Sequence, residues 1–103
     1  MPLVELYTRA ACHLCDDAKA VIERVRATRP FELRVIDIDT DPRLVALYGW
    51  EIPVVVVDGR KHAKLRLDER RFAERIARAA AGEVIPDGLD EEVAPAASKE
   101  VSP

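Results

Sequence analysis

Residues 3–25, LVELYTRAACHLCDDAKAVIERV, hold both cysteines of the chain, Cys12 and Cys15. Residues 3–7 alternate apolar with other side chains, which predicts a strand. Apolar residues then recur at the spacing of one helix face, and this helix must end before Pro30. The apolar positions of that face are Leu14, Ala18, Val21, Ile22 and Val25. The Cys-x-x-C motif is therefore predicted at the point where a strand turns into a helix.

The middle of the chain returns to strand patterns. Residues 31–39, FELRVIDID, are rich in β-branched and apolar side chains, as a second strand would be. Asp41 followed by Pro42 is typical of the start of a short helix, and Gly49 of its end. Residues 52–57, IPVVVV, form a continuous apolar run, which predicts a central strand buried on both faces.

The last part of the body predicts a hairpin and a final helix. Asp58-Gly59 is a turn signal before residues 61–67, KHAKLRL, which would form a fourth strand. Asp68 can cap a helix that ends near Gly82. The apolar face of that helix would consist of Phe72, Ile76, Ala79 and Ala80.

The predicted order βαβαββα restricts the topology. Strands joined through a helix favour parallel pairing, whereas the short hairpin requires an antiparallel neighbour. We therefore expect an α/β fold with a mixed four-stranded sheet flanked by three helices.

Length and charge predict one domain with a tail. A chain of 103 residues normally builds a single core, which we assign to residues 1–82. Residues 83–103 are acidic and rich in Pro and Ala, which favours a disordered segment. The net charge of −3 comes from this tail, because residues 1–82 carry about +2. The body shows no basic stripe interleaved with aromatics, so nucleic-acid binding is not expected.

Other features bear on location. No run approaches the roughly 20 apolar residues that span a bilayer, and the N-terminus lacks a basic, then apolar, leader pattern. Two cysteines are too few for a secreted disulfide scaffold. We expect a cytoplasmic protein without a membrane partner, whose thiols are redox-active or bind metal.

The predicted position of the cysteines favours thiol chemistry. The N-terminal end of a helix offers unpaired N–H groups and a positive dipole, and both would stabilise a thiolate at Cys12. Cys15 would lie one turn later on the same side of the helix. This spacing brings two sulfur atoms within disulfide reach.

The element order, the motif CHLC and the motif EIPVV together resemble the thioredoxin fold, most closely its small glutaredoxin-like members, over residues 2–81. The resemblance implies a thiol–disulfide oxidoreductase with a redox-active disulfide, in which Cys12 attacks and Cys15 resolves. It also implies a cis bond at Ile52-Pro53, with the Ile52 N–H and carbonyl groups turned outward to pair with a substrate.

The same resemblance implies partners. Arg9 falls where many glutaredoxins hold the glutathione carboxylate, and His13 lies beside the attacking thiol. The expected substrate is a disulfide-containing protein or a small thiol compound, in an electron-transport reaction. The reductant would be glutathione or a thioredoxin-reductase-type system, with a monomeric protein and no tightly bound cofactor.

The chain departs from the glutaredoxin pattern at two places. His13 and Leu14 stand where glutaredoxins commonly have proline and an aromatic residue. Arg66 and Leu67 precede Asp68, where glutaredoxins tend to have two glycines. Both departures weigh against glutathione as the physiological partner.

Alternatives remain open for individual residues. A lone Cys-x-x-C can be half of a zinc site, with His13 and His62 as the other soft ligands, so a metal- or partner-binding module with the same fold is the second hypothesis. His13 is either a cation that stabilises the thiolate or a surface residue. Trp50 is either a platform for a bound peptide or an aromatic of the core or its rim. Pro53 at the first residue of a strand is also permitted without a cis bond.

Overall fold

The computed structural model describes residues 1–82, and its order of elements is the predicted one. The proposed tail, 83–103, lies outside the described residues. The elements are β1 (Leu3–Thr8), α1 (His13–Arg26), β2 (Glu32–Asp37), the 3-10 helix η1 (Ile38–Thr40), α2 (Pro42–Tyr48), β3 (Val54–Val57), β4 (Arg60–Lys64) and α3 (Glu69–Ala80).

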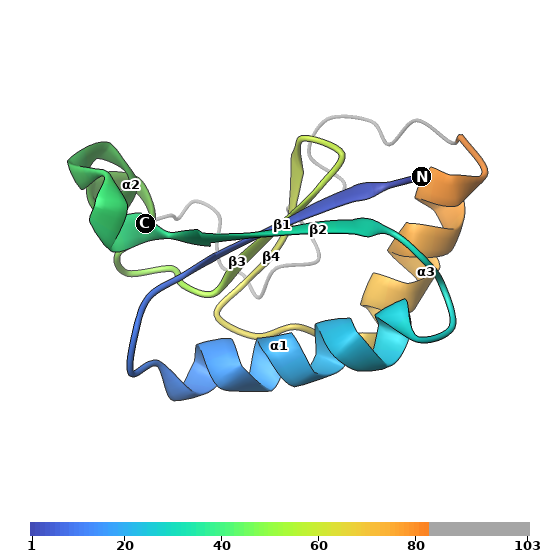
Figure 1. The fold of residues 1–103 in the computed structure, drawn as a ribbon, viewed down its shortest axis with the longest axis horizontal. Coiled ribbons are helices and arrows are strands. Elements are labelled where there is room, and N and C mark those ends of the chain that lie inside the picture. The colour runs from blue at the N-terminus through green and yellow to red at the C-terminus, as the bar shows by residue number, and fades with distance from the viewer. Residues whose placement is uncertain (83–103) are drawn as a thin grey trace.

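The four strands form one mixed sheet in the order β2-β1-β3-β4. β1 pairs parallel with β2, and the pairs β1–β3 and β3–β4 are antiparallel. Helices α1 and α3 lie together on one face of the sheet, whereas α2 lies at one end of it on the other side (Figure 1). The predicted mixed sheet with three helices is thus confirmed.

The hydrophobic core lies between the sheet and the helices α1 and α3. The Phe31 and Phe72 rings meet edge to face, with their centroids 5.7 Å apart. All four valines of β3 are buried, as predicted for a central strand. The buried cluster contains Val4, Leu6, Ala18, Ile22, Val25, Phe31, Val55, Val57, Ala63, Phe72 and Ile76.

The predicted turn residues fulfil their roles. Asp58 and Gly59 both have positive φ, 50° and 83°, which closes the two-residue hairpin between β3 and β4. The Asp58 carboxylate also accepts the Leu3 N–H at 2.8 Å, which ties the hairpin to β1. At Gly49, an added Cβ would lie 2.6 Å from the Val45 carbonyl oxygen, so the end of α2 has no room for a side chain.

Several predicted boundaries were wrong. The second strand ends at Asp37, because the Asp37 carboxylate accepts the Asp39 N–H at 2.9 Å and begins η1. β3 begins only at Val54, after the Ile52-Pro53 bend. The fourth strand covers Arg60–Lys64 and not residues 61–67, because Leu65 has a left-handed φ of 70° that no strand residue adopts.

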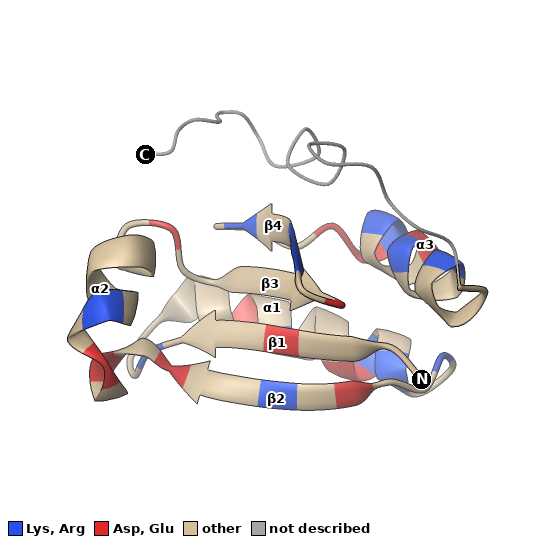
Figure 2. Ribbon diagram, turned by 90° about the horizontal axis from the view of Figure 1, so that it is seen from above, with Lys and Arg blue, Asp and Glu red and all other residues tan. Residues whose placement is uncertain are grey.

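The helices also show where polar and apolar faces lie. Ala80, expected on the apolar face of α3, is exposed, and Arg75 is buried in the same helix. Basic residues outnumber acidic ones on α3, and the arginine positions colour its ribbon blue at several places in Figure 2. Within residues 1–82 no helix has the length and apolar character needed to cross a bilayer.

Candidate functional site

Cys12 lies directly before α1, as predicted, and its sulfur caps this helix. Its backbone is extended (φ −118°, ψ 108°), and its Sγ atom accepts the Cys15 N–H at 3.2 Å. Ala11, the preceding residue, has a φ of 58° in the left-handed region, a conformation that is uncommon outside glycine and recurs at functional sites. The Cys12 side chain is partly exposed. A thiolate here would be both accessible and hydrogen-bonded.

Cys15 lies below Cys12 in the core, with only 1% of its surface exposed. Burial raises the pKa of the Cys15 thiol, and its hydrogen bond with Cys12 raises it further; the Thr8 hydroxyl and the Arg9 N–H partly offset this rise in pKa. Both cysteines are free thiols in the structure. The two sulfur atoms therefore differ in kind: one is accessible, and the other is buried and held protonated at neutral pH.

The Ile52-Pro53 peptide bond is cis. The register of β1 and β3 pairs Tyr7 with Val54, so Pro53 stands at the level of Thr8, which contacts Cys15. The Leu65 N–H donates to two carbonyl oxygens, that of Pro53 at 2.9 Å and that of Glu51 at 3.0 Å. The bend thus lies at the cysteine end of the sheet, with its backbone fixed by the loop after β4.

The Ile52 N–H does not face outward as expected. It donates to the Tyr48 carbonyl oxygen at 3.1 Å, and the Glu51 N–H donates to the same oxygen at 2.8 Å. The reason is that the short helix α2 ends at Tyr48, and its last carbonyl groups need donors from the following residues. Within residues 1–82 no hydrogen bond reaches the Ile52 carbonyl oxygen, so half of the expected pairing site remains.

Arg9 extends from the end of β1 to Asp39, a residue that the sequence did not single out. The guanidinium binds the carboxylate through two donors, with Nε 3.2 Å from Oδ2 and Nη2 also in contact. This hydrogen bond holds the pKa of Asp39 below its usual range and raises the pKa of Arg9. The carboxyl ends of parallel strands meet at one edge of a sheet, so the pairing of β1 with β2 could have indicated this contact.

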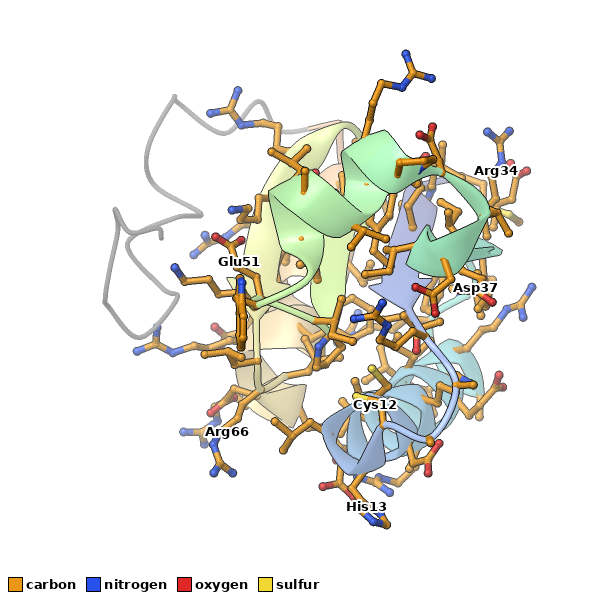
Figure 3. All side chains as sticks on the ribbon, turned by 90° about the vertical axis from the view of Figure 1, so that its left-hand side faces the viewer. Cys12, His13, Arg34, Asp37, Glu51 and Arg66 are labelled. Atoms are coloured by element: carbon orange, nitrogen blue, oxygen red, sulfur yellow. The ribbon has the colours of Figure 1, made fainter. Side chains whose placement is uncertain are left out.

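His13 and Arg66 lie around the site without closing it, and Trp50 is a surface residue. His13 is exposed, and its ring points away from the body of the molecule (Figure 3). Trp50 is 92% exposed, which excludes the core interpretation. Arg66 lies on the loop after β4, on the side of the view opposite Asp37 (Figure 3). Residues 1–82 contain no group of three or more His, Cys, Asp or Glu side chains that could hold a metal ion.

Most of the chain matches one protein family. Residues 3–77 match the family described as "Glutaredoxin-like domain (DUF836)". The chain belongs to this glutaredoxin-like family. Uncharacterized proteins of Mycobacterium tuberculosis and Mycobacterium bovis are each 36% identical to it over 86 residues, which cover 79% of this chain and 89% of theirs.

Solved structures show the fold that this glutaredoxin-like chain shares with other proteins. A structural-genomics target from X. campestris is similar with a TM-score of 0.62 and 29% identity, covering 72% of this chain and 95% of that one. The protein Ne2328 of Nitrosomonas europaea has a TM-score of 0.64 and 28% identity, covering 72% and 89%. A mutant thioredoxin of Halobacterium salinarum, at 21% identity and a TM-score of 0.58 over 82% and 78%, shows the shared fold.

Proposed function

We propose that the protein is a thiol–disulfide oxidoreductase in which Cys12 attacks and Cys15 resolves. The observation that carries this proposal is the contact between the partly exposed Cys12 Sγ and the Cys15 N–H, 3.2 Å apart at the start of α1. The Cys15 N–H donates a hydrogen bond to the sulfur that would become a thiolate. The positive end of the helix dipole stabilises the same negative charge.

The first step is attack of the Cys12 thiolate on one sulfur atom of a substrate disulfide. A new bond forms between the Cys12 Sγ atom and that sulfur, and the substrate S–S bond breaks. The second substrate sulfur leaves as a thiolate and takes up a proton. The product is a mixed disulfide between the protein and half of the substrate.

The second step is the release of the bound half. The Cys15 thiol gives up its proton, and its sulfur attacks the Cys12 Sγ atom one helical turn away. The substrate sulfur leaves reduced, so the substrate gains two electrons and the protein keeps a Cys12–Cys15 disulfide. The buried position of Cys15 supports this order, because an external disulfide reaches Cys12 first.

The Ile52 carbonyl group offers the approaching substrate a backbone acceptor. In an extended substrate segment, one N–H could pair with this oxygen beside the cysteines, as an added strand does. The Ile52 N–H, which donates to Tyr48, takes no part in this pairing.

A dithiol reductase of the thioredoxin-reductase type is the favoured electron donor. Arg9, expected to hold the glutathione carboxylate, is paired with Asp39 through two donors. A glutathione carboxylate would have to displace this partner. We assign the reaction to a reducing compartment such as the cytoplasm and to a monomer, with disulfide-containing proteins as substrates.

The test is reduction of hydroxyethyl disulfide in two parallel assays, one with NADPH and thioredoxin reductase, the other with glutathione and glutathione reductase. We expect turnover in the first assay and its loss in Cys12→Ser. Cys15→Ser should instead accumulate a mixed disulfide that mass spectrometry detects, because it lacks the resolving sulfur.

Two outcomes would count against the proposal. One is a purified protein with stoichiometric zinc or iron that forms no internal disulfide on oxidation, which would favour the metal-binding module. The other is full turnover by Cys12→Ser.

A further inference from the structure

A groove opens between α1 and the segment that joins β4 to α3. Its volume is about 480 Å³, within the range of sites that hold ligands. Leu14, which lies between the two cysteines in the sequence, lines the groove at the start of α1. Val21 lines it two turns further along the same helix. Leu65 and Leu67 line the opposite side. The groove therefore starts at the reactive motif and leads away from it along the helix.

The length of the groove suits a peptide. From Leu14 to Val21 the helix rises by about 10 Å, at 1.5 Å per residue. An extended chain advances about 3.3 Å per residue, so this distance corresponds to about three residues of a bound segment. An extended segment that begins at an attacked cysteine can reach the far end of the groove.

The charged residues of the groove divide between its two sides. Asp17 stands on the α1 side, whereas Arg66, Asp68 and Arg71 stand on the other. The Asp68 carboxylate is already engaged, because it accepts the Arg71 N–H at 2.9 Å as the cap of α3. In the part of the chain that the structure describes, the guanidinium groups of Arg66 and Arg71 form no ion pair. The side opposite α1 thus presents two cations that a ligand can neutralise.

We propose that this groove binds the substrate segment next to the attacked cysteine, with an apolar side chain between the leucines and an acidic side chain at Arg66 and Arg71. This proposal rests on the proposed function and names its substrate class: proteins whose reducible cysteine has an apolar and an acidic residue within about three positions. The apolar lining contributes through burial and the arginines contribute specificity.

The test uses the full chain carrying Cys15→Ser, which stops after the first step. Its rate of attack is measured on three peptide disulfides that differ near the cysteine: apolar with acidic, apolar with lysine, and alanine with acidic. The same rates are measured after adding Arg71→Glu or, as the matched control, Arg70→Glu. Both residues are exposed in the first turn of α3, but only Arg71 lines the groove.

We expect the apolar, acidic peptide to react fastest. Arg71→Glu should slow its attack about three- to fivefold, as an exposed ion pair allows, and Arg70→Glu should leave it unchanged. Hydroxyethyl disulfide, which is too small to fill the groove, should react equally with all three proteins.

Three outcomes would contradict this. Equal effects of Arg70→Glu and Arg71→Glu on every peptide would contradict the groove proposal and leave the proposed function standing. So would selective slowing of glutathione disulfide by Arg71→Glu, because glutathione would then be the occupant. Failure of the Cys15→Ser protein to attack even hydroxyethyl disulfide would overturn the proposed function, and the groove proposal with it.

Discussion

Helices α1 and α3 begin in the same way with different capping atoms. At α3, the Asp68 carboxylate accepts the N–H of the residue three positions later at 2.9 Å. At α1, the Cys12 sulfur accepts the equivalent N–H at 3.2 Å. A carboxylate oxygen is a strong acceptor for this N–H, and its charge suits the positive end of the helix dipole. A thiol carries a charge only after it loses its proton.

This difference separates a stabilising cap from a reactive one. At the start of α3, the Asp68 carboxylate is engaged in the hydrogen bond that caps the helix. The start of α1 has the same donor and dipole, but they are available to a charge that forms when Cys12 ionises. Removing the sulfur while keeping an anion should therefore convert the reactive helix start into a second stabilising one.

The largest expected effect is that of Cys12→Asp. Without the sulfur, disulfide reduction should be lost completely, whereas the free energy of unfolding should exceed that of Cys12→Ala by about 1 kcal/mol, the usual value of an N-cap. Urea unfolding and the hydroxyethyl disulfide assay measure the two quantities. Equal stability of the Asp and Ala variants would show that position 12 does not cap α1.

Asp68→Ala should reduce stability without touching either sulfur. Loss of this cap is expected to lower the free energy of unfolding by about 1 kcal/mol, or the melting temperature by roughly 4–8 °C. Thermal unfolding followed by circular dichroism measures it, with Asp68→Asn as the matched control because Asn also caps well. If Asn proves as destabilising as Ala, the Asp68 contact with the Arg71 N–H is not what stabilises α3.

The smallest effect is expected for the ion pair that joins the two helices. Arg24 Nε lies 3.0 Å from Glu69 Oε1, and both side chains are about half exposed, so water and salt screen the pair. A double-mutant cycle with Arg24→Ala and Glu69→Ala should give a coupling free energy of about 0.2–1 kcal/mol. A larger coupling would show that this pair is screened less than its exposure implies.

The sequence predicted what depends on local patterns. The place of Cys12 before a helix, the Asp58-Gly59 hairpin and the Asp68 cap each follow from residue type and spacing, and each is confirmed. The buried valine run likewise identified the central strand. These features need no knowledge of distant contacts.

The features that were missed depend on strand pairing and on the residues at which helices and strands end. Arg9 meets Asp39 only because β1 and β2 pair in parallel. The Ile52 N–H donates to Tyr48 because α2 ends one turn earlier, a detail of boundaries that periodicity does not resolve. Residues 65–67, Leu-Arg-Leu, continued the alternating strand pattern, but a positive φ at Leu65 ends the strand and leaves these residues to line the groove.

The central claim, that Cys12 attacks and Cys15 resolves, is tested most directly by alkylation of the reduced protein with iodoacetamide at a series of pH values. Mass spectrometry of the separated peptides gives the rate for each cysteine, and the urea-unfolded chain, where both should react alike, is the control. Because burial raises the pKa of Cys15, its thiol stays protonated as the pH rises through the ordinary thiol range near 8.5 and reacts only above it. We predict that Cys12 is modified first throughout the series. Faster modification of Cys15 at neutral pH would contradict the account.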